Sequence, residues 1–169
     1  PENVVRKGIS LVPEGRRIFG RLTVDENLRL AIFIREDAAE AAADLERIVE
    51  RFPILRERRH APAGRLSGGE QQILAIARAV LARPKLMLVD EPALGLAPLM
   101  IELVYEILTD LQKQGMTLLV VEQNLERALA VADRIYVLRG GQVQLTGTVE
   151  ELRDSEQLVA AYFGVETLG

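Results

Sequence analysis

The stretch Leu66–Gln72, LSGGEQQ, decides how this chain folds. Ser67 and Glu70 have the spacing of a capping box, so we expect a helix to begin just after Ser67. The apolar residues that follow at helical spacing predict a buried stripe of Ile73, Leu74, Ala77, Val80 and Leu81. Gly68 and Gly69 add no bulky side chains to the first turn, and such a helix start, with its backbone N–H groups and partial positive charge, suits a phosphate.

A second motif follows this helix. Lys85–Val89 is a short apolar run that predicts a buried strand, and Asp90, Glu91 and Pro92 come directly after it. Two carboxylates at a strand end repel each other unless a cation or a reaction uses them. A capping box before an apolar helix is ordinary structure by itself. The carboxylate pair at the next strand end is what favours a phosphate site.

In this order and spacing, LSGGEQQ and LMLVDEP resemble the signature motif and the Walker B motif of ATP-binding-cassette (ABC) ATPases. The resemblance covers most of the chain. It implies an α/β fold of the P-loop NTPase type, in which a parallel sheet core carries an inserted helical subdomain. It also implies a single ABC ATPase domain over 1–169, with the helical subdomain at 16–82, the α/β core at 83–148 and a helical C-terminal tail at 149–169.

Composition narrows the classes of function. A chain of 169 residues has the length of a single domain and can bury a hydrophobic core. A formal net charge of -4 and an aromatic content of 4% argue against nucleic-acid binding. The absence of cysteine is compatible with the cytosol. The longest apolar runs, such as Leu118–Val121, are far too short to span a bilayer, so we expect any membrane association to run through a partner.

The pattern after residue 85 alternates strands with helices, which predicts a parallel sheet. The expected strands are Gly8–Val12, Lys85–Val89, Thr117–Glu122 and Ile135–Leu138, with Gly140 and Gly141 turning a hairpin after the last of them. The expected helices are Thr23–Ile34, Ala38–Phe52, a helix from Pro98 that closes at Gly115, Leu125–Ala132, and a tail that begins at a Thr148/Glu151 capping box.

Four polar residues, Glu14, Asp90, Glu91 and Gln123, lie at the carboxyl ends of three predicted strands, where parallel α/β sheets bind their ligands. Asp90 is the expected Mg²⁺ contact, through water, because magnesium keeps most of its hydration shell. Glu91 stands one residue past its strand, suited to orient and deprotonate an attacking water.

The resemblance adds roles for other positions. Glu14 stands where ABC ATPases normally carry the Q-loop glutamine, which touches the metal and relays to a transmembrane partner; from the residues alone, a solvated turn residue is an equal alternative. Gln123 stands where a histidine usually reads the γ-phosphate, and a glutamine can hydrogen-bond there without carrying charge. Both surrounding sequences, VPEGRR and VVEQN, resemble importers of branched-chain amino acids. The D-loop segment PALGL lacks the usual aspartate.

One expected motif is absent. The sequence contains no Gly-x-x-x-x-Gly-Lys-Ser/Thr segment, the loop that cradles phosphates with backbone amides and a lysine. The family places that loop upstream of the Q-loop, so we expect the chain to be N-terminally shortened and inactive alone. Apolar surface beside the strand Leu86–Val89 should then lie open. In ABC dimers the signature of one subunit, here Ser67, Gly68, Gly69 and Glu70, completes the nucleotide site on its partner.

The leading interpretation is the ATP-hydrolysing subunit of an importer for branched-chain amino acids. It would use ATP and Mg²⁺ at the cytoplasmic face of the membrane, with a second ABC ATPase subunit and permease subunits as partners and no nucleic acid. An amide or urea importer is an alternative, as is a lipid-handling ABC ATPase, although Gln123 counts against the latter. A further alternative is a catalytically incomplete interaction module that pairs with a complete ATPase. The missing phosphate loop favours this module for the chain as given, whereas the Asp90–Glu91 pair opposes it for the parent protein. The long heptads or zinc-binding cysteines of DNA-repair ABC ATPases are missing.

Overall fold

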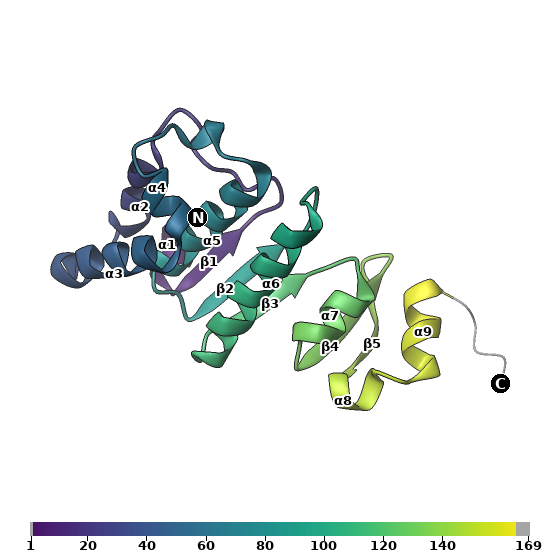
Figure 1. Cartoon of the computed structure of the whole chain (residues 1–169). Helices are drawn as coiled ribbons and strands as arrows, with labels where there is room; N and C mark the ends of the chain where they lie inside the picture. The colour runs from purple at the N-terminus through teal and green to yellow at the C-terminus, as the bar shows by residue number, and fades with distance from the viewer. Residues whose placement is uncertain (1, 165–169) are drawn as a thin grey trace. The chain divides into compact units, whose positions relative to one another are not determined.

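The computed structural model describes residues 2–164, which fall into two compact units that divide between Val121 and Glu122 (Figure 1). Within the described residues, none of the helices combines the length and the apolar character needed to cross a membrane.

The first unit contains a parallel three-stranded sheet, as the alternating pattern predicts. Its strands are β1 (Ile9–Val12), β2 (Leu86–Asp90) and β3 (Thr117–Val121), in the order β1-β2-β3. In the register, Val12 lies beside Val89, and Asp90 lies beside Val121. Consequently β1 and β2 end at nearly the same level, and the residues that follow Val12 meet those that follow Val89.

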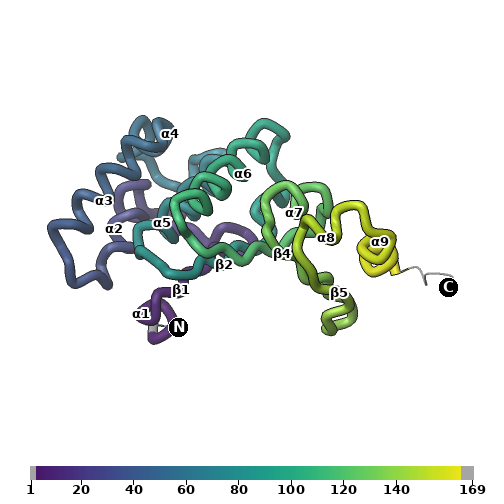
Figure 2. Tube along the Cα trace, turned by 90° about the horizontal axis from the view of Figure 1, so that it is seen from below, coloured from purple at the N-terminus to yellow at the C-terminus, as the bar shows by residue number. Residues whose placement is uncertain are grey.

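Two helices, α5 (Gly68–Leu81) and α6 (Pro98–Lys113), cover one face of this sheet; Figure 2 shows them side by side above β1 and β2. The strand residues on the covered face are buried, namely Val12, Met87 and Val89. On the other face Leu11 is 58% exposed and Leu119 is 52% exposed. The expected open apolar surface beside β2 is therefore present.

Three helices, α2 (Val24–Ile32), α3 (Ala38–Arg51) and α4 (Pro53–Glu57), pack against α5. The 3-10 turn η1 (Ala63–Arg65) comes shortly before α5 in the chain, and α1 (Glu2–Arg6) packs against β1 instead. Complete capping boxes at Thr23 and Ser67 confirm the predicted starts of α2 and α5. Two details differ. Pro53 starts α4 in addition to ending α3, because proline is tolerated in a first turn. Also, α5 is buried on nearly all sides and not along one stripe.

The second unit is an antiparallel hairpin packed with short helices. It consists of α7 (Leu125–Val131), β4 (Arg134–Arg139), β5 (Gln142–Thr148), α8 (Val149–Leu152) and α9 (Glu156–Phe163). Gly140 and Gly141 turn the hairpin with φ of 57° and 77°. The expectation that Ile135–Leu138 extends the parallel sheet is wrong. The predicted hairpin is confirmed, and it occupies one edge of β4; none of the described strands pairs with the other edge.

Candidate functional site

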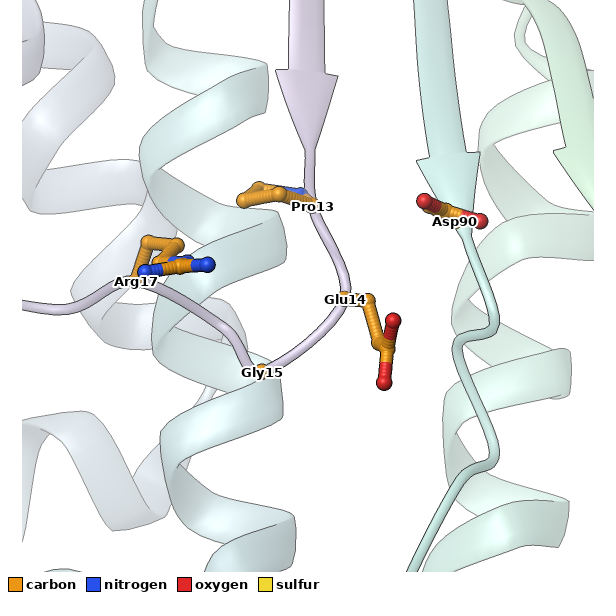
Figure 3. Close-up of a pocket in the computed structure, with 5 residues that line it drawn as sticks. All are labelled: Pro13, Glu14, Gly15, Arg17 and Asp90. Carbon is orange, nitrogen blue, oxygen red and sulfur yellow. The ribbon is translucent and has the colours of Figure 1, made fainter.

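An open pocket of about 410 Å³ lies where β1 and β2 end, lined by Pro13, Glu14, Gly15, Arg17 and Asp90. In Figure 3 the Glu14 side chain points toward β2, which ends at Asp90. Arg17 lies on the opposite side of the turn at Gly15. The sheet register explains this meeting, since Val12 and Val89 are paired immediately before the two carboxylates. Glu14 and Asp90, which the sequence predicts to converge, are therefore brought together.

The donor set of this pocket suits magnesium more than a metal held entirely by protein. Mg²⁺ takes one or two carboxylates, keeps several waters and binds substrate phosphates. Asp90 and Glu14 supply two carboxylates on an open pocket with room for such ligands. Within residues 2–164, no three His, Cys, Asp or Glu side chains gather into a metal cage. An ion at Asp90 would therefore be completed by water and by a bound phosphate.

Glu91 has a backbone conformation that few residues adopt. Its φ is 45°, in the left-handed region that non-glycine residues rarely occupy. Its amide donates to the Val121 carbonyl of β3 at 3.0 Å, and its own carbonyl accepts from the Leu94 amide at 3.2 Å. These two bonds fix the turn directly after β2. Backbone strain of this kind concentrates at functional sites.

None of the four signature residues at the start of α5 lines that pocket. Ser67 Oγ accepts from the Glu70 amide at 3.4 Å, and Glu70 Oε2 accepts from the Ser67 amide at 2.6 Å. The amides of Gly68 and Gly69 donate no hydrogen bond to any described residue. A Cβ added at Gly69 would lie 2.5 Å from Met100 Cε, so only glycine fits there without displacement.

The loop after Glu14 is tied to α5 by residues that the sequence did not reveal. Arg78 of α5 donates to the Arg17 carbonyl at 3.2 Å, and its guanidinium lies 5.1 Å from the centre of the Phe19 ring. Burial lowers the pKa of Arg78. Asn27 is fully buried, accepts from the Phe19 amide at 2.9 Å and donates to the Phe19 carbonyl at 3.0 Å. The sequence did offer one signal for Asn27, because it is a polar residue on the buried face of the helix predicted for Thr23–Ile34.

Gln123 belongs to the second unit, two residues after β3 ends in the chain. Its backbone carbonyl accepts a hydrogen bond from the Tyr162 hydroxyl of α9 at 2.7 Å. The next residue, Asn124, caps α7 by accepting from the Arg127 amide at 2.9 Å. The predicted convergence of Gln123 with Asp90 and Glu91 remains a prediction.

Residues 1–94 match the sequence pattern of the family described as "ABC transporter". The high-affinity branched-chain amino acid transport ATP-binding protein BraG of Pseudomonas aeruginosa is 46% identical over 161 residues, which cover 95% of this chain and 69% of BraG. The lipopolysaccharide export system ATP-binding protein LptB of Haemophilus influenzae is 35% identical over 164 residues, covering 96% of this chain and 68% of LptB.

Solved structures with the same fold include the ADP conformation of an ATP-binding cassette of an ABC transporter. That structure has a TM-score of 0.76 and 25% identity over 97% of this chain and 71% of its own. A dimeric ATP-binding cassette in a post-hydrolysis state, bound to ADP and Pi, has a TM-score of 0.73 and 27% identity over 85% of this chain and 64% of its own.

Proposed function

This chain belongs to the ABC transporter family, and we propose that it is the ATP-hydrolysing subunit of an importer for branched-chain amino acids. The observation that carries the proposal is its similarity to BraG, which extends over nearly the whole chain. Its place would be the cytoplasmic face of the membrane, where permease subunits move the amino acid and ATP hydrolysis drives them.

The strand-end pocket is the proposed place of the metal and the attacking water. Asp90, with Glu14 beside it, would hold Mg²⁺ through water, and the ion would supply charge neutralisation for the phosphates. Glu91 would orient the attacking water and accept its proton, the role of a general base. The two backbone bonds that fix the strained Glu91 support this role, because a general base must be held in place before the substrate arrives.

The start of α5 is the proposed contact with the γ-phosphate of a nucleotide held by a second ABC ATPase subunit. Ser67 and Glu70 fix the first turn, and the unpaired amides of Gly68 and Gly69 would donate to the phosphate. The solved dimeric cassette supports an assembly of two such subunits, either identical or different. Gln123 would take the place of the usual histidine and hydrogen-bond the same phosphate without adding charge.

A second candidate function is export of a lipid, which the similarity to LptB favours. Import of an amide or urea is a further variant of the leading proposal. Transport by the reconstituted assembly separates them. Uptake of leucine or valine that depends on ATP supports the first function, and movement of lipopolysaccharide supports the second.

The experiment for the catalytic proposal compares Mg²⁺-ATP hydrolysis by the protein as its gene encodes it with that of Glu91→Gln and of the control Glu50→Gln, an exposed carboxylate on α3. Loss of the base should slow hydrolysis by roughly 100-fold or more, and the control should keep its rate. Residues 1–169 alone should not hydrolyse ATP, because each missing phosphate-loop donor is worth roughly 3–4 kcal/mol. Hydrolysis by residues 1–169 that disappears with Glu91→Gln would mean that other groups hold the phosphates.

A further inference from the structure

The three residues between β3 and α7 are each held by a different hydrogen bond. Glu122 Oε1 accepts from the Asn124 amide at 2.9 Å, and Asn124 Oδ1 accepts from the Arg127 amide at 2.9 Å. These two bonds are local. The Gln123 carbonyl instead accepts from the hydroxyl of Tyr162, which is 39 residues away in the sequence. This bond joins the backbone of Gln123 to a separate helix, α9.

That helix is fixed in the core of the second unit. Leu158 of α9 is 1% exposed and belongs to a buried cluster with Ile135, Val149 and Leu152. Tyr162 lies one helical turn after Leu158, on the same side of α9. Its ring also makes an edge contact with Phe163, with the ring centres 4.9 Å apart. The hydroxyl that reaches the Gln123 carbonyl is therefore carried by a helix that Leu158 anchors in the core.

The hydroxyl of Tyr162 differs from that of another surface tyrosine in the same unit. Tyr136 of β4 is 58% exposed, and its hydroxyl donates no hydrogen bond to any described residue. Tyr162 is 41% exposed, yet its hydroxyl is engaged at 2.7 Å. Removing the Tyr162 hydroxyl would therefore cost a specific contact, whereas removing the Tyr136 hydroxyl would change only a solvated group.

We propose that Tyr162 is a positioning residue that fixes the backbone of Gln123 and thereby directs its carboxamide to the γ-phosphate. This inference rests on the proposed function of Gln123. A neutral carboxamide attracts a phosphate through directed hydrogen bonds, so its effect depends on orientation more than that of a charged group would. Small displacements of a positioned group can slow a reaction by as much as roughly 100-fold. A hydroxyl that holds the backbone at Gln123 limits such displacement.

The test compares steady-state ATP hydrolysis by the protein as its gene encodes it with that of Tyr162→Phe and of the matched control Tyr136→Phe. Loss of one hydrogen bond should lower kcat roughly threefold to tenfold in Tyr162→Phe, with little change in KM for ATP or in melting temperature. The control should match wild type. A Tyr162→Phe variant with a lowered melting temperature but an unchanged kcat would leave the hydroxyl a structural role only and overturn the proposal.

Gln123→Ala separates failure of this inference from failure of the proposed function. Gln123→Ala should slow hydrolysis, and adding Tyr162→Phe to it should cause no further loss, because the hydroxyl acts through the Gln123 side chain. A wild-type rate in Gln123→Ala would overturn both proposals. If Gln123→Ala hydrolyses ATP slowly but Tyr162→Phe keeps the wild-type rate, only the positioning role is overturned. The same conclusion follows if the losses of rate add up in the double variant.

Amide hydrogen exchange provides a test of the same proposal that needs no bound nucleotide. Tyr162→Phe should speed exchange in the segment 122–125, since the carbonyl bond that restrains it is lost, and Tyr136→Phe should not. Equal exchange in both variants would show that the hydroxyl does not restrain Gln123, and it would overturn the proposal independently of activity.

Discussion

The helices α2 and α5 begin with the same motif but differ in their first turns. Thr23–Glu26 and Ser67–Glu70 both form complete capping boxes. In α2 the next two amides, of Val24 and Asp25, donate to backbone carbonyls within residues 59–61 at 3.1 and 2.9 Å. The first turn of α2 is therefore satisfied by its own protein.

In α5 the corresponding positions are Gly68 and Gly69, whose amides donate to no described residue. Arg16 lies against Gly68 and Met100 lies against Gly69. A capping box therefore marks where a helix begins but not what the helix end does. The proposed phosphate contact of α5 rests on the amides of Gly68 and Gly69, which donate to no described residue, and on Gly69, where an added side chain would meet Met100.

The largest expected effect on stability comes from giving α5 a side chain where α2 has one. In Gly69→Ala the new Cβ would lie 2.5 Å from Met100 Cε and 2.9 Å from Met100 Cβ, too close to be relieved by the tip of the side chain alone. The free energy of unfolding should fall by about 1–3 kcal/mol, as in other overpacked sites. The control is Gly68→Ala, whose Cβ would meet only the far end of the Arg16 side chain, at 3.1 Å. Equal urea midpoints for the two variants would contradict this reading of the α5 start.

An intermediate effect on stability is expected for Asp25, which occupies in the first turn of α2 the position that Gly69 occupies in α5. Its carboxylate accepts from Arg29 at 2.5 Å and from Arg59 at 2.7 Å. Asp25→Ala should lower the free energy of unfolding by about 1.5–2 kcal/mol at pH 7 through the loss of these charged hydrogen bonds. The control is Glu50→Ala, which removes an exposed carboxylate of α3.

The pH dependence of this contribution follows from the pKa of Asp25. Partial burial alone would raise that pKa, but the hydrogen bonds from Arg29 and Arg59 outweigh burial and lower it from 3.8. A carboxyl with a lowered pKa stabilises the fold above its unfolded value and loses that effect as pH falls through the folded value. The difference between wild type and Asp25→Ala should therefore shrink below about pH 4. A difference that stays constant down to pH 2 would rule out the ion pairs as its source.

The predictions that rest on local spacing were correct. The contacts that the sequence did not reveal join residues far apart in the chain. The boxes at Ser67 and Thr23 and the carboxylate at the end of β2 depend on residues a few positions apart, so the sequence alone locates them. The sealing of α2 by residues 59–61 and the bond from Tyr162 to Gln123 join segments separated by more than thirty residues. No periodicity marks such partners. The hairpin of β4 and β5 was also predicted from local signals, Gly140 and Gly141, whereas strand–helix alternation alone wrongly placed β4 in the parallel sheet.

The smallest change in stability gives the sharpest test of the comparison. Ser67→Ala and Thr23→Ala each remove the side-chain oxygen of a capping box, so each should lower the free energy of unfolding by about 1 kcal/mol. If both boxes are only structural, ATP hydrolysis by the protein as its gene encodes it should change equally in the two variants.

Our proposal predicts otherwise. Ser67 fixes the turn whose amides would meet the phosphate, whereas Thr23 fixes a turn that is already satisfied by residues 59–61. Ser67→Ala should therefore reduce hydrolysis well beyond the loss in Thr23→Ala, although the melting temperatures of the two variants should fall by similar amounts. Melting curves and hydrolysis rates from the same preparations provide the measurement. Equal rates at matched stability would reduce Ser67 to a helix cap, and the phosphate contact would have to be sought elsewhere on the chain.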